Sequence, residues 1–292
     1  LEGLVNYGKA GHIIVLTWHP SNPTNPSYGT HFHNLTTTQF KQMLDDSTTI
    51  GQNWQAEIDK IAPVLQRFQQ NNIPVVFKPL HEQNAEWFWW GHNQVAGKAL
   101  ADRQLAFRNV WKDLVKNLTQ DKGLDNLLFL FAASTVTYDK TVATTTYYPG
   151  SDLVDIVGID VYQEQLNLGG SRIGKQHYVE LIKTGKPFGL AEFGQDQDQN
   201  GSTGSTGAQW DAKTLIYKIA SEYPRTAFAI AWYTNEDDPQ YPSKFKNGEW
   251  RPERFALPDV SNTQALLIDP LIETYVGNSN APPVALPGNN QT

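Results

Sequence analysis

The chain has no cysteine among its 292 residues, which excludes a disulfide framework, a thiolate metal site and a cysteine nucleophile. It also has no apolar run of about 18 residues, the length that a membrane-spanning helix requires. Basic residues are few and unclustered: Lys and Arg number 23 against 30 Asp and Glu, giving a net charge of -7. This balance argues against a nucleic-acid or anionic-membrane partner.

Aromatic residues are frequent, at 12% of the chain, and include nine tryptophans. We assign about half of these to the core, and the rest offer flat ring faces on which the C–H faces of sugars can pack. No charge run, repeat or long linker divides the sequence. We therefore predict one domain over residues 1–278, followed by a Pro/Asn-rich tail or linker over 279–292.

The most informative stretch is Val75 to Gly91, VVFKPLHEQNAEWFWWG. Val75 to Phe77 is typical of a strand that is buried on both faces. The strand is followed by a His-Glu pair and a tryptophan-rich loop. Because α/β barrels carry their catalytic residues at the carboxyl ends of strands, Glu82 is a candidate catalytic residue.

A second apolar run ends in a glutamate at Lys186 to Gln195, KPFGLAEFGQ, which makes Glu192 the other candidate. Either glutamate alone could be a surface or capping carboxylate. Two strand-end glutamates, one beside a tryptophan cluster, are the minimum set for hydrolysis of a glycosidic bond with retention or inversion.

The apolar patterns predict alternating strands and helices, the order of a parallel α/β fold. Asp160 and Tyr162 are two apart on one strand and so point to the same side. The predicted strands are 12–18, 75–82, 127–134, 154–162, 187–194 and 227–234; the predicted helices are 37–46, 52–71, 100–119, 171–184, 209–223 and 265–276, with Trp111 packing inward.

HEQNAEWFWWG resembles the acid/base segment of family 26 glycoside hydrolases, the β-mannanases of the large retaining (β/α)8 clan. Four further segments are similar to that family's motifs and follow its order: TWHPSNP (17–23), IDVY (159–162), AEFG (191–194) and AIAWYTN (229–235). The resemblance runs from about residue 1 to about residue 278.

The resemblance implies a role for eight side chains. Glu82 would be the acid/base at the end of strand four and Glu192 the nucleophile at the end of strand seven. The implied substrate-binding residues are His19 and His81 at the cleaved sugar, Trp232 beneath it, Trp87 on the leaving sugar, Tyr162 orienting the nucleophile, and Asp160. Lys78 stands where the family usually has Arg; Lys cannot make a planar bidentate contact, so the carboxylate network around Glu82 is left open.

The strand count is too low for a closed barrel, because closure needs eight strands and the sequence provides six. On the family's order, residues 12–18 would be strand three. We therefore expect a (β/α)8 barrel lacking its first two strands in this numbering, with roughly sixty residues expected before Leu1.

Two patterns of residues in the sequence resemble metal sites. His31 and His33 have the H-x-H spacing of metal-dependent hydrolases but lie in a Pro/Asn/Gly-rich loop rather than on a strand. Asp196, Asp198 and Asn200 begin a calcium-loop pattern, but its twelfth position is Gly207 instead of Glu, so chelator and calcium should leave the melting temperature unchanged. We predict no metal and no cofactor.

The resemblance implies a retaining endo-β-1,4-mannanase whose partner is a mannan-type β-glycan. We expect a monomer, which the polymeric substrate would place outside the cell. The resemblance also covers mixed-linkage β-glucanases and β-1,3-xylanases. A glycan-binding barrel without activity is a further alternative.

Overall fold

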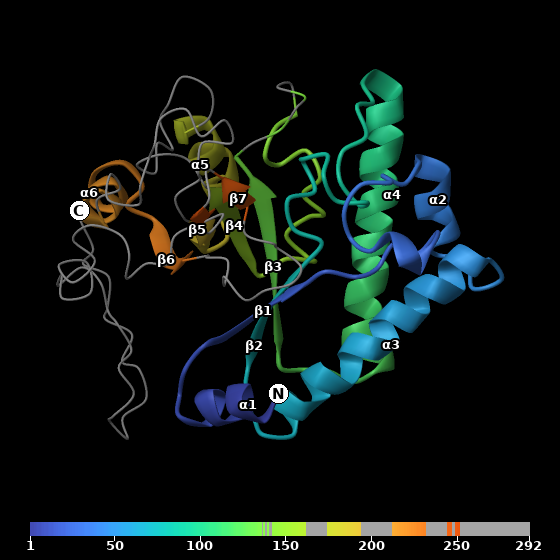
Figure 1. Ribbon diagram of the computed structural model, residues 1–292, viewed down its shortest axis with the longest axis horizontal. Helices are drawn as coiled ribbons and strands as arrows, with labels where there is room; N and C mark the ends of the chain where they lie inside the picture. The colour runs from blue at the N-terminus through green and yellow to red at the C-terminus, as the bar shows by residue number, and fades with distance from the viewer. Residues whose placement is uncertain are drawn as a thin grey trace.

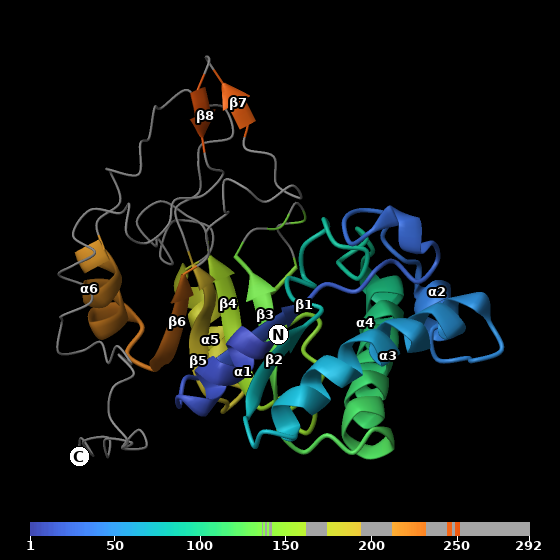
Figure 2. The same ribbon diagram turned by 60° about the horizontal axis from the view of Figure 1, so that its bottom comes forward.

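The computed structural model describes residues 1–135, 137, 139, 142–161, 174–193, 212–231, 244–246 and 249–251. In this part of the chain, six parallel strands form one curled sheet in the order β1-β2-β3-β4-β5-β6 (Figures 1 and 2). Each strand lies beside the next one in sequence, as in a (β/α) barrel and unlike a doubly wound sheet. The strands are β1 (Ile14–Trp18), β2 (Val75–Pro79), β3 (Leu127–Ser134), β4 (Ile156–Val161), β5 (Phe188–Phe193) and β6 (Thr226–Ala231).

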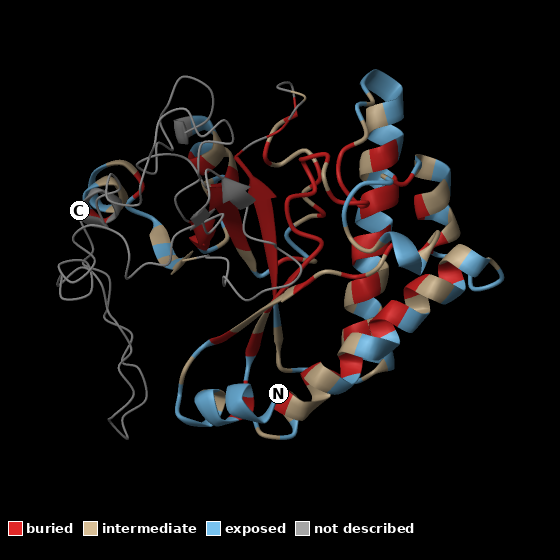
Figure 3. Cartoon of the chain, in the orientation of Figure 1, coloured by how far each residue is buried: buried red, intermediate tan, exposed pale blue. Residues whose placement is uncertain are grey.

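Helices connect β1 to β2, β2 to β3, β4 to β5 and β5 to β6, whereas β3 and β4 have no helix between them among the described residues. The long helices α3 and α4 lie beside β1, β2 and β3, with their buried faces toward the sheet (Figure 3). The helices are α1 (Glu2–Lys9), α2 (Thr37–Gln42), α3 (Thr49–Gln69), α4 (Gly97–Lys116), α5 (Gly174–Ile182) and α6 (Ala212–Glu222). No helix among the described residues is both long and apolar enough to cross a bilayer.

Helix α3 shows how the sequence pattern produces this layer. Thr48 caps its start, because the Gly51 N–H donates to Thr48 Oγ1 at 2.9 Å. Trp54, Ile58 and Leu65 then recur at helical spacing and are fully buried. The predicted helix and its apolar face are confirmed.

The core has two parts on opposite faces of the sheet. Leu130 and Ala132 of β3 form a small cluster with Ala191 of β5. Phe129 and Phe131 of the same strand belong to the large cluster that includes α3 and α4. Because side chains alternate along a strand, β3 is apolar on both faces, one lining the inside of the half-barrel and one packing on helices.

The end of β2 differs from the sequence-based expectation. β2 ends at Pro79 rather than at residue 82, and Leu80 and Glu82 have φ of 47° and 54° in the turn that follows. After β6, the short antiparallel pair β7 (Lys244–Lys246) and β8 (Glu249–Arg251) is separate from the barrel sheet. The expected helix 265–276 and the tail 279–292 lie outside the described residues.

Candidate active site

Lys78 of β2 lies at the centre of a charged group inside the half-barrel. Its Nζ donates to Glu192 Oε1 at 2.6 Å and to Asp160 Oδ1 at 2.9 Å, and lies 3.5 Å from the Ala191 carbonyl. None of the Lys78 side chain is exposed. A buried ammonium needs such partners, because burial without them costs several kcal/mol. Lys78 thus connects β2 to both β4 and β5.

A β-bulge brings the two carboxylates of this group side by side. The pairing of β4 with β5 runs from Ile159 opposite Leu190 to Asp160 opposite Glu192, so Ala191 is an extra residue in β5. A bulge of this kind re-aims the side chain that follows it. The result is that Asp160 and Glu192 share one ammonium.

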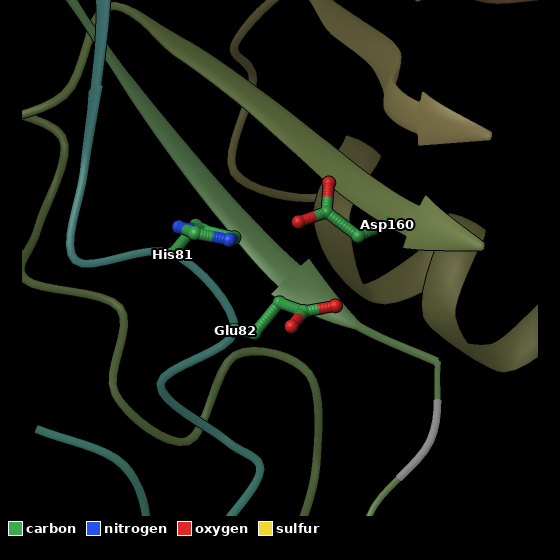
Figure 4. A group of neighbouring side chains, drawn as sticks. All are labelled: His81, Glu82 and Asp160. Carbon is green, nitrogen blue, oxygen red and sulfur yellow. The ribbon is translucent and has the colours of Figure 1, made fainter. Parts of the chain in front are cut away.

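Glu82 reaches the same group from the turn after β2. One side-chain atom each of His81, Glu82 and Asp160 lies within 4.8 Å of the others, at the carboxyl end of the sheet (Figure 4). The Glu82 N–H donates to the Ala132 carbonyl at 2.8 Å, which fixes the turn to β3. The positive φ of Glu82 is a strained conformation of the kind that clusters at functional sites.

Trp87 contacts the carboxyl group of Glu82 directly. Its Nε1–H donates to Glu82 Oε2 at 2.7 Å, and its ring is only half-buried. The next three aromatic residues differ from it. Phe88, Trp89 and Trp90 are buried, and the two indole N–H groups donate to the carbonyls of Pro20 (2.8 Å) and His81 (2.7 Å). Of these four aromatic residues, Trp87 is the one whose side chain is partly exposed and can meet a ligand.

His81 and His19 form a second wall of the site. Their rings are 4.8 Å apart, and His81 Nε2 lies 3.9 Å from Glu192 Oε1. Burial lowers the pKa of His19 to about 4, and burial together with the nearby Lys78 ammonium holds the pKa of His81 well below its usual value. Both imidazoles are therefore neutral at pH 7.

Burial also governs the pKa values of Lys78 and Asp160. Burial alone would lower the pKa of Lys78, but the charges of Asp160 and Glu192 outweigh it and raise that pKa. Burial raises the pKa of Asp160 well above its usual value; Lys78 opposes this, whereas Glu192 and Glu82 add to it. Lys78 thus stays charged at neutral pH, and Asp160 holds a proton more readily than an ordinary aspartate does.

Two buried polar atoms of the site have no hydrogen-bond partner within the described residues: His81 Nδ1 and Asp160 Oδ2. Buried polar atoms are normally paired, so these two atoms are candidates for hydrogen bonds to a bound ligand. The spacing of His81, Glu82 and Asp160 would also admit a metal ion. However, Asp160 already accepts from the Lys78 ammonium, which supplies the positive charge a metal would bring.

The turn that carries Glu82 is fastened to β3 by Asn84. The Ser134 N–H donates to Asn84 Oδ1 at 2.8 Å, and Asn84 Nδ2 donates to the Ser134 carbonyl at 2.9 Å. Both residues are buried. These two hydrogen bonds hold the strained turn in place. The role of Asn84 was not predicted from the sequence.

Six of the eight predicted site residues come together in the structure: Glu82, Glu192, His19, His81, Asp160 and Trp87. Tyr162 and Trp232, and the Asp196 loop, lie outside the described residues. The sequence analysis placed Lys78 near Glu82, but its partners are Asp160 and Glu192. The sequence did offer one signal for these partners: Lys78 is a lone charged residue directly after an apolar run, Val75 to Phe77, that is typical of a strand buried on both faces.

Comparison with known proteins gives a consistent result. The chain is 34% identical over 234 residues to a mannan endo-1,4-beta-mannosidase of Bacillus subtilis strain 168, covering 78% of this chain and 58% of that protein. It is 33% identical over 234 residues to mannan endo-1,4-beta-mannosidase A and B of Caldalkalibacillus mannanilyticus, covering 79% and 42%. The chain thus spans about half the length of these curated relatives.

The crystal structure of the Bacillus subtilis mannanase BCman superposes with a TM-score of 0.72 at 30% identity, covering 92% of this chain and 68% of that one. The family model for glycosyl hydrolase family 26 matches residues 1–247, which include both glutamates, their histidines and the Lys78 group. The chain therefore belongs to glycosyl hydrolase family 26.

Proposed function

We propose that this protein is a retaining endo-β-1,4-mannanase with Glu192 as nucleophile and Glu82 as acid/base. The observation that carries the proposal is the pair of buried glutamates at the carboxyl end of one parallel sheet, each with a carboxylate oxygen within 4.8 Å of a His81 ring nitrogen. Their environments differ as the two roles require. Glu192 accepts a hydrogen bond from the Lys78 ammonium, whereas Glu82 accepts one from the neutral indole N–H of Trp87.

In the first step, a Glu192 oxygen attacks the anomeric carbon while Glu82 gives its proton to the leaving oxygen. This forms the glycosyl-enzyme ester and releases the leaving sugar as an alcohol. In the second step, Glu82 takes a proton from water, which attacks the anomeric carbon and returns Glu192 as a carboxylate. The Lys78 ammonium stabilises Glu192 as an anion at the start and at the end of this cycle.

The substrate assignment rests on the relatives named mannan endo-1,4-beta-mannosidase and on the neutral donors of the site. Neutral His19 and His81 suit hydroxyl groups rather than charged sugars. By the same resemblance, Tyr162 orients Glu192 and Trp232 lies beneath the cleaved sugar. We further propose that the protein acts as a monomer. We also propose that it acts outside the cell, because its polymeric substrate is found there.

Release of reducing sugar from mannan, mixed-linkage β-glucan and β-1,3-xylan tests the substrate. We expect release from mannan and glucomannan and at most trace release from the others. Preference for either other polymer would reassign the substrate within the family, and no release from any would favour a glycan-binding barrel.

The roles of the glutamates are tested with an activated substrate, dinitrophenyl β-mannoside, whose leaving group needs no proton. Glu82→Ala should still form the glycosyl-enzyme, accumulate it, and be rescued by azide to a product of retained configuration. Glu192→Ala should be inactive on this substrate and on mannan. Exchanged behaviour of the two variants would reverse the roles. A product of inverted configuration from the unmodified protein would refute retention.

A further inference from the structure

Phe32 is a large apolar side chain that the fold leaves 64% exposed. It lies in the loop of residues 20–35 that follows β1. Its φ is 60°, and the next residue, His33, has φ of 53°. Positive φ is uncommon for residues other than glycine, and bulky residues adopt it only where their surroundings hold them there. Packing in the core does not explain why these two successive residues adopt positive φ, because the Phe32 ring is exposed.

Hydrogen bonds fasten this part of the loop to the segment that follows the catalytic turn. The Phe32 N–H donates to the Trp87 carbonyl at 2.7 Å, and the Trp89 N–H donates to the Thr30 carbonyl at 3.1 Å. Asn34 Nδ2 adds a bond to the Phe88 carbonyl at 2.7 Å. The backbone that bears the Phe32 ring is thus held in place by hydrogen bonds.

The loop is also supported from its other side. Asn22, fully buried, donates from Nδ2 to the His33 carbonyl at 3.1 Å, and its N–H donates to the Gly29 carbonyl at 2.8 Å. The rings of Tyr28 and His33 stack at 3.9 Å. These contacts fix the residue next to Phe32, so the ring is held in position before any ligand arrives. Such preorganisation lowers the entropic cost of binding.

The contacts of Phe32 also indicate the side of the cleft on which it lies. Trp87 donates to Glu82 Oε2 through its indole and accepts from the Phe32 N–H through its carbonyl. Glu82, as the acid, faces the oxygen of the leaving sugar. The Phe32 backbone is therefore next to Trp87, whose indole contacts the acid, and we assign Phe32 to the leaving-group side on this basis.

We propose that Phe32 forms a distal sugar-binding subsite on the leaving-group side, where its ring packs against the C–H face of a hexopyranose in a β-linked chain. A phenyl ring provides apolar area without hydrogen bonds, so this subsite favours length of the chain over a particular pattern of hydroxyl groups. The assignment of the side rests on the proposed function, because Glu82 defines the leaving group.

Phe32→Ala tests the subsite, since it removes the ring and keeps the Cβ. Two substrates are compared: mannohexaose, which extends beyond the leaving sugar, and an aryl β-mannobioside, whose leaving group carries no sugar. We expect the ratio of their kcat/KM values to fall about tenfold, equivalent to about 1.4 kcal/mol. Phe32→Trp should preserve the ratio. Tyr217→Ala is the matched control, because Tyr217 is an aromatic residue of α6 that is 73% exposed, and it should also leave the ratio unchanged.

A binding measurement separates this inference from the proposed function. Calorimetric titration of mannohexaose into Glu192→Ala, with and without Phe32→Ala, needs no turnover. About tenfold weaker binding on loss of the ring supports the subsite even if the parent protein cleaves nothing. An unchanged affinity and an unchanged kcat/KM ratio would overturn it, as would equal losses on both substrates, which would place Phe32 at the cleaved bond instead.

Discussion

Replacement of Lys78 by methionine tests how the site holds its charges. Methionine has a similar length and shape but no charge. The substitution removes the ammonium that lies 2.6 Å from Glu192 and 2.9 Å from Asp160 and leaves both carboxyl groups buried together. Breaking a buried ion pair in this way costs about 3–5 kcal/mol, because the remaining charge has no compensation. We expect that loss in the free energy of unfolding at pH 7, a large share of the ~5–15 kcal/mol typical of a folded protein.

The sign of the pH dependence follows from the pKa directions. A raised pKa lets Lys78 stabilise the native protein fully below its unfolded pKa of about 10.5, and this contribution is lost only as pH rises through the folded value. A carboxyl with a raised folded pKa, such as Asp160, instead destabilises the fold as pH rises from its unfolded value near 3.8. Removal of the ammonium takes away a charge that favours the ionised form of both carboxyl groups, so this loss of stability with rising pH should be larger in the variant. The penalty of Lys78→Met should thus be smallest near pH 4 and grow toward pH 7.

Urea denaturation at several pH values measures this penalty, and the kcat/KM profile on mannan provides a second readout. The acid limb of the profile should move to higher pH, because ionised Glu192 has lost its cation. Lys98→Met is the control: Lys98 and Asp102 form an exposed pair on α4, worth at most about 0.5 kcal/mol. A penalty for Lys78→Met that is equal at pH 4 and pH 7, or an unmoved acid limb, would refute the reasoning.

Asn84→Ala should cost about 1–3 kcal/mol of stability in thermal or urea melts, because it leaves the buried Ser134 N–H unpaired, and it should reduce kcat by loosening the Glu82 turn; full activity would contradict this role. Trp87→Phe keeps an aromatic ring but removes the N–H from which Glu82 accepts a hydrogen bond. The alkaline limb of the pH–rate profile should therefore move to higher pH. An unmoved limb would show that this bond does not affect the acid. Gly158→Ala should destabilise by about 1–3 kcal/mol, because its Cβ would lie 2.6 Å from that of Ala191, whereas Gly3→Ala, with nothing within 4 Å, should not; equal melting temperatures would contradict the close packing at the bulge.

The order of the barrel strands could be predicted because each is a short apolar run between polar segments. The positions of Glu82 and Glu192 followed from where those runs end. The conformation of the turn could not be predicted, since neither Leu80 nor Glu82 favours positive φ; bonds to β3 such as that from Glu82 to Ala132 hold it.

The partners of Lys78 also could not be predicted from the residues near it in the sequence. Glu192 lies 114 residues away, and it faces Asp160 only because β5 contains one extra residue at Ala191. A bulge has no reliable signature in a single apolar strand. Sequence analysis therefore identified the reacting carboxyl groups but not the cation between them.

The long separation of Lys78 from its partners has a consequence for folding. In a partly folded chain in which only β1, β2 and β3 have paired, Lys78 has neither Asp160 nor Glu192 beside it, so its ammonium must either stay in water or be buried without a counter-charge. Burial of an uncompensated charge is costly, so such an intermediate is penalised until β4 and β5 join the sheet. The ion pairs that serve the reaction thus disfavour a stable intermediate made of β1, β2 and β3 alone. They couple formation of the catalytic centre to completion of the sheet.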